Sequence, residues 1–437
     1  MTHLVHRLVD PGVGETTSRT RTREVCSSPT SSRQVPRDVF GLVDHLRSFI
    51  GRPFEYHQAA ECQLALEGYS NVAWQWESSS RCYPLAPDQP RVLAGRNGEY
   101  TLIGQISAGG MGVIYLMEGG QGPCIVKMAR PLPSTPKEPD SHSTKQSIED
   151  SKERLGEMNA SIRSLIGEII KMLYLSDPST RLDQSLGPIV YDFGFYQGQP
   201  WVAMEKLETT LSFLKYALCR KIEEVDLAKL SKLGREKLHA IRRLSEKDRV
   251  RYILKVFIAA LSKLAPIHQA SVLHRDLNPS NIMLSSGDQL ISPEIDPCVK
   301  IIDFGISLYN YNPPDNAGTP KYLAPERIER TLTGSSKFVV GIPSDIFAIG
   351  VSLFWSLSGG LHPILPTGSW DCDSFLLNQR MTGYNDTEIP NISNFLGKEF
   401  ASLDAPLKRA LARDPDSRFQ RAMDMANSLK AALDQIC

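Results

Sequence analysis

The spacing of apolar residues divides the chain into regions of different character. Residues 1–38 are rich in Ser, Thr and Arg and poor in large apolar residues, so they offer too little buried surface to offset the entropy of ordering a backbone. We expect a flexible tail there. Apolar residues return within 39–96, enough for a small helical extension of unknown role. From Tyr100 the pattern changes again, and a second, larger domain is expected over 97–437.

Short apolar runs that begin at Tyr100 have the alternation and flanking turn residues of β-strands. They read YTLIGQI, VIYLM, CIVKM, PIVYDFGFY and PWVAMEKL. Between the third and fourth runs lie a loop dense in Pro, Ser and Lys at 131–145 and a helical pattern over 155–173. The pattern therefore predicts an α+β lobe at about 97–205, with a five-stranded antiparallel sheet and one helix.

The rest of the chain, about 206–437, has mainly helical spacing. Over 250–267 apolar residues recur at i, i+3 and i+4 for more than four turns, which predicts a core helix. A second segment, 345–357, is apolar on nearly every side, follows Ser344 as an N-cap and stops at a pair of glycines. We expect a second, mainly helical lobe built around these two helices.

Composition narrows the classes of partner. The 437 residues carry 49 basic and 49 acidic side chains and no net charge, so nothing indicates a nucleic-acid partner or an anionic membrane surface. The eight cysteines lack metal-ligand spacing, which favours reduced thiols and a cytoplasmic setting. No run of about 18 apolar residues is present, so we expect neither a signal peptide nor a membrane span.

A Gly-rich turn joins the first two predicted strands, as Ile106-Ser107-Ala108-Gly109-Gly110-Met111-Gly112-Val113. Glycines let a backbone approach a phosphate and turn its N–H groups toward the anion, although such a turn taken alone is an ordinary hairpin. Lys127 interrupts an apolar strand; it either extends to the strand edge or meets an anion. Glu168 interrupts the following helical pattern and is a candidate partner.

The densest chemical signal is HRDLNPSN at 274–281, followed by Asp303-Phe304-Gly305 after a short strand. Phosphoryl transfer needs an aligned hydroxyl, a proton acceptor and cations around the polyphosphate. Asp276 suits the first two tasks, and Asn281 and Asp303 offer the hard oxygen ligands that Mg²⁺ prefers. Each tripeptide taken alone also arises by chance, since loop aspartates usually cap turns.

Taken in order, these motifs resemble the signature set of the eukaryotic-like (Hanks-type) Ser/Thr protein kinases. The resemblance covers about three quarters of the chain and implies the bilobal protein kinase fold. Residues that match the family's ATP-binding positions are Ser107, Gly109, Gly110, Gly112, Ile114, Lys127, Met204, Glu205 and Leu207. Those that match its catalytic positions are Lys127, Glu168, Asp276 and Asn278, with Asn281 and Asp303 as the metal ligands. Positions that shape the activation segment and the second lobe are Arg275, Thr319, Glu326, Asp345 and Arg418.

The resemblance also implies an activity. It implies ATP and Mg²⁺ as cofactors, with Mn²⁺ as an alternative ion, Asp276 as the base, and transfer of the γ-phosphate to a hydroxyl of a protein substrate. The stretch GTPKYLAPE at 318–326 resembles the Ser/Thr-specific version of the segment that holds a peptide. Small-molecule kinases of related fold are not expected to have it. The sequence leaves the oligomeric state open.

Two departures from the family pattern bear on activity. Ser107 stands at the first position of the Gly-rich loop, and Asn278 stands where these kinases usually have a lysine that contacts the transferring phosphate. Losing a preorganised electrostatic contact can cost about 10²-fold in rate, so slow turnover is expected. The alternative is a pseudokinase, a nucleotide- or partner-binding scaffold; the retained Lys127, Asp276, Asn281 and Asp303 argue against it.

Two further features concern regulation and surface. The insertion between Lys127 and Glu168, and the Lys- and Glu-rich stretch at 220–245, are expected to be solvated surface, with partner docking as the alternative.

Between Ser307 and Thr319 there is no Ser or Thr to phosphorylate. We therefore expect Asp315 to pair with Arg275 and to order the segment without phosphorylation.

Overall fold

The computed structural model describes most of the chain, and the residues that it describes belong to one compact unit within 35–437. The described residues are 39–50, 52, 54–68, 91–109, 112–129, 145–175, 185–196, 199–219, 227–228, 230–285, 291–292, 294–305, 308–309, 318–333, 339–365 and 374–436. Several predictions therefore fall outside the described residues: the flexible tail, the loop at 131–144, the backbone of Gly110 and the pairing of Asp315 with Arg275.

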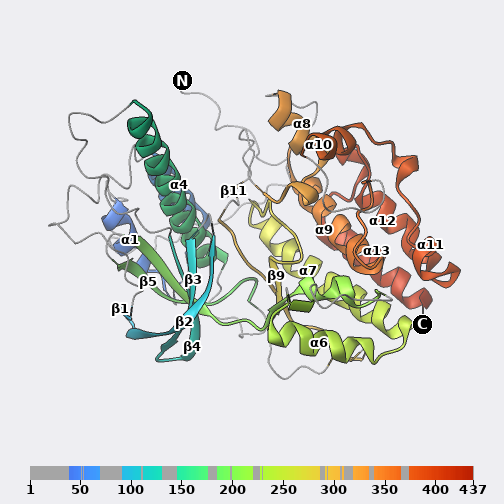
Figure 1. Cartoon of the computed structure of the whole chain (residues 1–437), viewed down its shortest axis with the longest axis horizontal. Helices are drawn as coiled ribbons and strands as arrows, with labels where there is room; N and C mark the ends of the chain where they lie inside the picture. The colour runs from blue at the N-terminus through green and yellow to red at the C-terminus, as the bar shows by residue number, and fades with distance from the viewer. Residues whose placement is uncertain are drawn as a thin grey trace, which may run out of the picture. The chain divides into compact units, whose positions relative to one another are not determined.

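A six-stranded antiparallel sheet occupies the N-terminal part of the described chain, in the order β1-β2-β3-β4-β6-β5 (Figure 1). Its strands are β1 (Val92–Ala94), β2 (Glu99–Gly109), β3 (Gly112–Gly119), β4 (Gly122–Met128), β5 (Val190–Tyr196) and β6 (Gln199–Glu205). The predicted count of five strands is corrected, because β1 pairs with the start of β2, Leu93 opposite Tyr100. Three residues are too few for alternation to reveal a strand.

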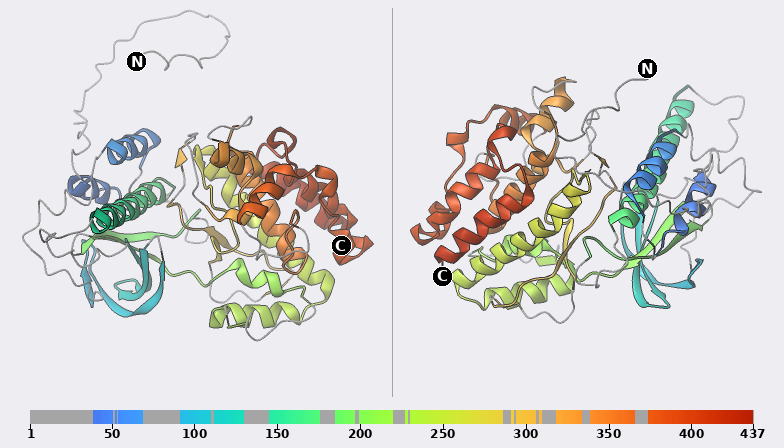
Figure 2. Two further views of the ribbon diagram at one scale, coloured as in Figure 1. Left: turned by 45° about the horizontal axis from the view of Figure 1, so that its top comes forward. Right: turned by 180° about the vertical axis from the view of Figure 1, so that it is seen from behind.

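Helices cover one side of this sheet. The long α4 (Lys145–Leu175) contains the segment predicted as helical and packs against β6, while α1 (Val39–Arg47) packs against β5 and α2 (Tyr56–Gly68) packs along α4 (Figure 2). A second, smaller core lies within the sheet and contains Tyr100, Met117 and Trp201. The sheet and α4 form what we call the N-lobe.

The residues from about 206 onward, here the C-lobe, are mainly helical, as predicted. The helices are α6 (Lys232–Arg242), α7 (Glu246–Gln269), α8 (Pro325–Thr333), α9 (Ile342–Leu357), α10 (Ser374–Gly383), α11 (Ser393–Leu396), α12 (Asp404–Ala410) and α13 (Ala422–Ile436). Short strands β7 (Thr209–Thr210), β9 (Ile282–Leu284) and β10 (Val299–Ile301) form a second sheet, and β8 (Val272–Leu273) pairs with β11 (Leu308–Tyr309). Helix α7 packs against α9, α13 and β10, and so forms the central support of the lobe.

The start of α9 differs from the sequence prediction. Its N-cap is Gly341, and Ser344 lies one turn inside the helix, where its hydroxyl accepts the backbone N–H of Gly341 at 3.3 Å and donates to Glu326 at 2.6 Å. Only one half of a capping box is present, because Gly341 has no side chain and the backbone N–H of Ser344 donates instead to the Gly341 backbone oxygen at 2.9 Å. Ser344 therefore links α9 to α8 instead of beginning the helix.

The expectation of solvated surface at 220–245 is wrong for the part that the structure describes. Lys237, Leu238 and Ile241 of α6 are buried, and Lys237 pairs with Glu208 at 3.2 Å. Arg242 donates to two backbone carbonyl oxygens of the preceding segment, at 2.9 and 2.7 Å. A charged composition hid an amphipathic helix, because apolar residues three apart suffice to make one buried face.

Among the described residues, no helix is both long and apolar enough to cross a membrane.

Candidate active site

The loop at 274–281, which follows β8, has a strained backbone. Contacts with Asp345 of α9 hold it in place. Arg275 has φ +72°, a left-handed conformation that costs a non-glycine residue about 1–2 kcal/mol. The buried Asp345 of α9 accepts the backbone N–H groups of His274 and Arg275, both at 2.8 Å, and meets His268 Nε2 at 3.0 Å. Although burial opposes ionisation, these contacts lower the pKa of Asp345. An ionised carboxylate in the core thus fixes the loop.

Both carboxylate oxygens of Asp276 accept hydrogen bonds, which fix the orientation of the side chain. Its Oδ1 accepts the backbone N–H of Thr319 at 2.8 Å, and its Oδ2 accepts the amide of Asn281 at 3.1 Å. Asn278 donates to the backbone oxygen of Asp276 at 3.1 Å and to Thr319 Oγ1 at 3.3 Å. The structure thus brings together four predicted site residues, of which Thr319 is the N-cap of η2 (Pro320–Tyr322).

Asp303 follows β10 and lies against the same loop. The backbone N–H of Ile302 donates to Asn281 O at 2.9 Å, and His274 Nε2 meets Ile302 O at 2.8 Å. Asp303 has φ +63°, a second left-handed residue. These bonds place the residue before Asp303 beside the catalytic loop, so the carboxylates of Asp276 and Asp303 belong to one site.

Lys127 of β4 connects the N-lobe to Asp303. Its Nζ lies 2.7 Å from Glu168 Oε2 on α4 and 3.0 Å from Asp303 Oδ1. Burial by itself lowers the pKa of Lys127, but the two carboxylates outweigh it and raise the pKa above its ordinary value. Burial raises the pKa of Asp303, and Lys127 reverses this to a net lowering. The site therefore holds a charged lysine and an ionised aspartate in contact.

The Gly-rich segment forms the hairpin between β2 and β3, with Ser107 opposite Ile114 and Gly109 opposite Gly112. Gly112 has φ +141°, and a Cβ added there would lie 2.2 Å from the backbone oxygen of Met128 on β4. No other residue type fits that approach. Ser107 lies within the paired strand, where its Cβ is ordinary.

The predicted adenine-binding residues lie at the end of β6, which contains Met204 and Glu205, and just after it, at Leu207. Met204 and Leu207 are buried. Glu205 Oε2 lies 2.5 Å from Nζ of the fully buried Lys300 on β10 and accepts the backbone N–H of Ile189 at 3.2 Å. The Glu205 side chain therefore holds the two lobes together and does not face a ligand. Sequence reasoning missed Lys300, although its signal was a lysine inside an apolar strand.

Glu326 and Arg418 form a fully buried ion pair at the start of α8. Both guanidinium nitrogens Nη1 and Nη2 lie 2.9 Å from the carboxylate oxygens of Glu326, in the parallel arrangement that is strongest for this pair. The remaining donors of Arg418 are also used: Nε donates to Ala412 O at 2.6 Å. The pair anchors the start of α8 to the loop before α13.

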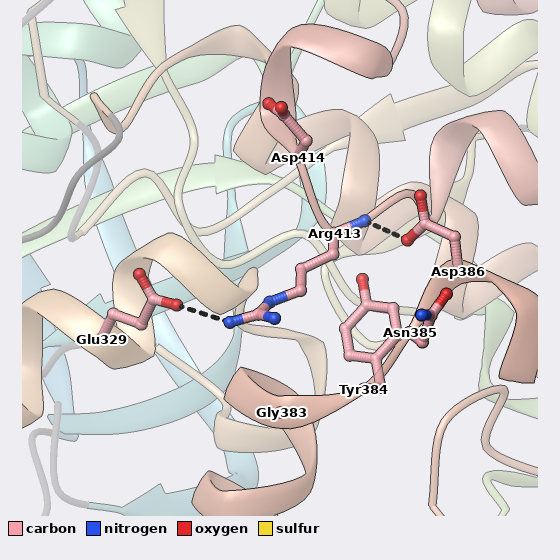
Figure 3. Close-up of a pocket in the computed structure, with 7 residues that line it drawn as sticks. All are labelled: Glu329, Gly383, Tyr384, Asn385, Asp386, Arg413 and Asp414. Carbon is pink, nitrogen blue, oxygen red and sulfur yellow. Dashed lines mark hydrogen bonds and ion pairs between the residues drawn. The ribbon is translucent and has the colours of Figure 1, made fainter.

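A separate hollow of about 480 Å³ opens between α8 and the loops around Tyr384 and Arg413 (Figure 3). Arg413 reaches Glu329 at 3.4 Å, and its backbone N–H donates to Asp386 at 2.7 Å. None of the predicted site residues lines this hollow. It is therefore distinct from the cluster around Asp276.

Comparison with known proteins agrees with these features. Residues 222–428 match the model of the protein kinase domain, a range that contains the catalytic loop but not the Gly-rich hairpin, Lys127 or Glu168. A probable serine/threonine-protein kinase of Streptomyces coelicolor is 28% identical over 208 residues, 46% of this chain and 26% of that protein. PknB of Mycobacterium tuberculosis is 29% identical over 183 residues, 40% of this chain and 25% of that protein.

Two further similarities, one in sequence and one in structure, differ in extent. The serine/threonine-protein kinase Pkn1 of Myxococcus xanthus is 28% identical over 190 residues, 41% of this chain and 24% of its own length. A solved structure of a double mutant of the M. tuberculosis PknI kinase domain has 20% identity and a TM-score of 0.45, covering 79% of this chain and 99% of that one. The alignments thus span about a quarter of the length of the curated relatives. Over residues 222–428 the chain is similar to the protein kinase domain, and the curated relatives that it matches over 40–46% of its length are serine/threonine-protein kinases.

Proposed function

We propose that the protein is an ATP-dependent Ser/Thr kinase that transfers the γ-phosphate to a hydroxyl of a protein substrate. The observation that carries this proposal is the convergence of Lys127, Glu168 and Asp303 within 3.0 Å, next to a loop that orients Asp276. A scaffold without turnover has no physical need for this convergence. In this proposal the kinase domain spans about 97–437 together with β1.

The chain's own residues divide the work of the reaction. Lys127, kept charged by Glu168 and Asp303, attracts the α- and β-phosphates and so aligns the nucleotide. Asp276 accepts the proton of the substrate hydroxyl, because its oxygens are already turned by Thr319 and Asn281 and need no reorganisation. The GTPKY stretch at 318–322 holds the substrate backbone near that carboxylate.

The residues present fit a divalent ion held together with the phosphates. Among the described residues, no group of three or more His, Cys, Asp or Glu side chains could hold a metal alone. Asp303 has an ionised carboxylate with 35% of its side chain exposed, and Asn281 supplies an amide oxygen. One or two such ligands plus substrate phosphates are the usual set for Mg²⁺. When bound, the ion would neutralise charge on the polyphosphate.

A cytoplasmic setting is part of the proposal. In the described part of the chain, Cys62, Cys124, Cys219 and Cys298 form no disulfide. Reduced cysteines are typical of reducing compartments.

The proposal is tested by incubating the purified chain with labelled ATP, Mg²⁺ and a generic protein substrate. Label should appear on Ser or Thr of the substrate. Nucleotide binding without transfer above an enzyme-free blank would support the scaffold instead. No binding at all would reject both readings.

Changing Asn278 to Lys should raise kcat by about ten-fold or more, because it restores a positive charge near the transferring phosphate. The gain is limited by the loss of the turn in which Asn278 Oδ1 accepts the backbone N–H of Ser280 at 2.9 Å. Asn278→Met is the matched control, since it has similar length and no charge. Equal rates for the Lys and Met variants would show that the missing charge is not what slows the enzyme.

A further inference from the structure

Helix α2, which lies outside the predicted kinase domain, packs along the helix that carries Glu168 (Figure 2). Ala59, Cys62 and Leu66 of α2 are buried in the same core cluster as Ile162 and Ile166 of α4. This contact buries one face of α4 that would otherwise meet water. Helix α2 therefore lowers the freedom of α4 to tilt or rotate.

A polar contact fixes how the two helices lie. Arg163 of α4 donates through Nη1 to the backbone oxygens of Leu66 at 3.0 Å and Glu67 at 3.2 Å, at the C-terminal end of α2. The last carbonyls of a helix lack partners within the helix and carry its negative pole, so a guanidinium there is doubly favourable. At the other end of the extension, Arg47 of α1 donates to Phe193 O on β5 at 2.7 Å.

The side of α4 near Glu168 is also closed by α2. A Cβ added at Gly167 would lie 3.4 Å from Lys171 Nζ and 3.5 Å from Gln63 Oε1, both ordinary contact distances, so Gln63 of α2 lies next to this part of α4. Lys171 is buried one turn beyond Glu168, and burial lowers its pKa to about 8, while Glu168 and Glu67 oppose the shift and Arg275 adds to it. The carboxylates of Glu168 and of Glu67 on α2 offset part of the cost of burying this amine.

We propose that α1 and α2 form a built-in brace for α4, and that Arg163 is a positioning residue which keeps Glu168 on Lys127. Arg163 lies five residues before Glu168, about 7.5 Å along the same helix, so movement at one is transmitted to the other. The ion pair of 2.7 Å between Glu168 and Lys127 needs α4 within a narrow range of positions. The inference rests on the proposed function through its use of ATP binding.

A double-mutant cycle tests whether Arg163 acts through Glu168, with ATP affinity of the full chain as the measurement. Arg163→Ala should weaken ATP binding by about five-fold, and Arg163→Lys should restore at least half of the loss. In a Glu168→Gln background the same Arg163→Ala change should have less than a two-fold effect. Losses that simply multiply would overturn the proposal. Arg421→Ala, at an exposed arginine, is the matched control and should bind ATP normally.

A second measurement separates failure of the brace from failure of the proposed function. If the wild-type chain does not bind ATP, the proposed function fails, and hydrogen exchange then tests the brace alone. Amides of residues 160–173 should exchange at least about ten-fold faster in Arg163→Ala than in the wild type, and at the wild-type rate in Arg421→Ala. Unchanged exchange in Arg163→Ala would show that α2 does not hold α4.

Discussion

Replacing Asp276 by Asn should lower kcat by about 10²- to 10⁴-fold, the range that a positioned proton acceptor supplies, while ATP affinity stays within about three-fold. The amide cannot accept the proton of the substrate hydroxyl. It can still accept the backbone N–H of Thr319, now at 2.8 Å. Its NH2 group cannot accept the amide of Asn281, but Asn281 keeps its bond of 2.8 Å to the backbone oxygen of the same residue, so the loop should keep its shape. Two measurements separate an effect on catalysis from an effect on binding: the rate of phosphoryl transfer to a protein acceptor, and the equilibrium affinity for ATP.

The matched control is Asp296→Asn, which removes an exposed carboxylate whose partner is Lys255 at 3.0 Å. This change should leave kcat and ATP binding unaltered. Two outcomes would contradict the assignment of Asp276. A variant that keeps more than about a tenth of the wild-type kcat would place the proton acceptor elsewhere, and a parallel loss of ATP binding would mean that the change damaged the site as a whole.

Much of the fold could be predicted because its elements have strong periodic patterns. The strands β2 to β6 are short apolar runs between turns, α7 shows the 3.6-residue repeat, and α9 is an apolar run closed by a pair of glycines. The misses have physical reasons. Strand β1 is three residues long, and α6 hides a buried face in a charged segment. Neither gives a window long enough or apolar enough for a periodic signal.

The site residues could be proposed from the order of their motifs along the chain. The residues that hold them in position could not. Lys300 and Glu205 meet at 2.5 Å across 95 residues, and Arg163 reaches the end of α2 across 97. Such contacts depend on how two elements pack, which a single sequence does not encode locally. A lone lysine in a strand or an arginine on a helix predicts only that some partner exists.

The largest loss of stability is expected for Arg418→Met, which should lower the free energy of unfolding by about 3–5 kcal/mol. Arg418 is fully buried, and its guanidinium makes two bonds of 2.9 Å to Glu326. Without the guanidinium, the buried carboxylate of Glu326 keeps the hydrogen bond from the Ser344 hydroxyl at 2.6 Å. One neutral donor cannot replace the positive charge of Arg418. Urea unfolding, followed by fluorescence, measures the change.

The effect is large because Arg418→Met leaves the Glu326 carboxylate buried without a cationic partner. A second variant tests this reason. Glu326→Gln combined with Arg418→Met removes both charges, so the pair should lose less than the sum of the two single changes. Arg421→Met, at an exposed arginine, should change stability by less than about 0.5 kcal/mol. If Arg418→Met costs less than about 1 kcal/mol, water must reach Glu326. The ion pair would then not be what holds the start of α8 in place.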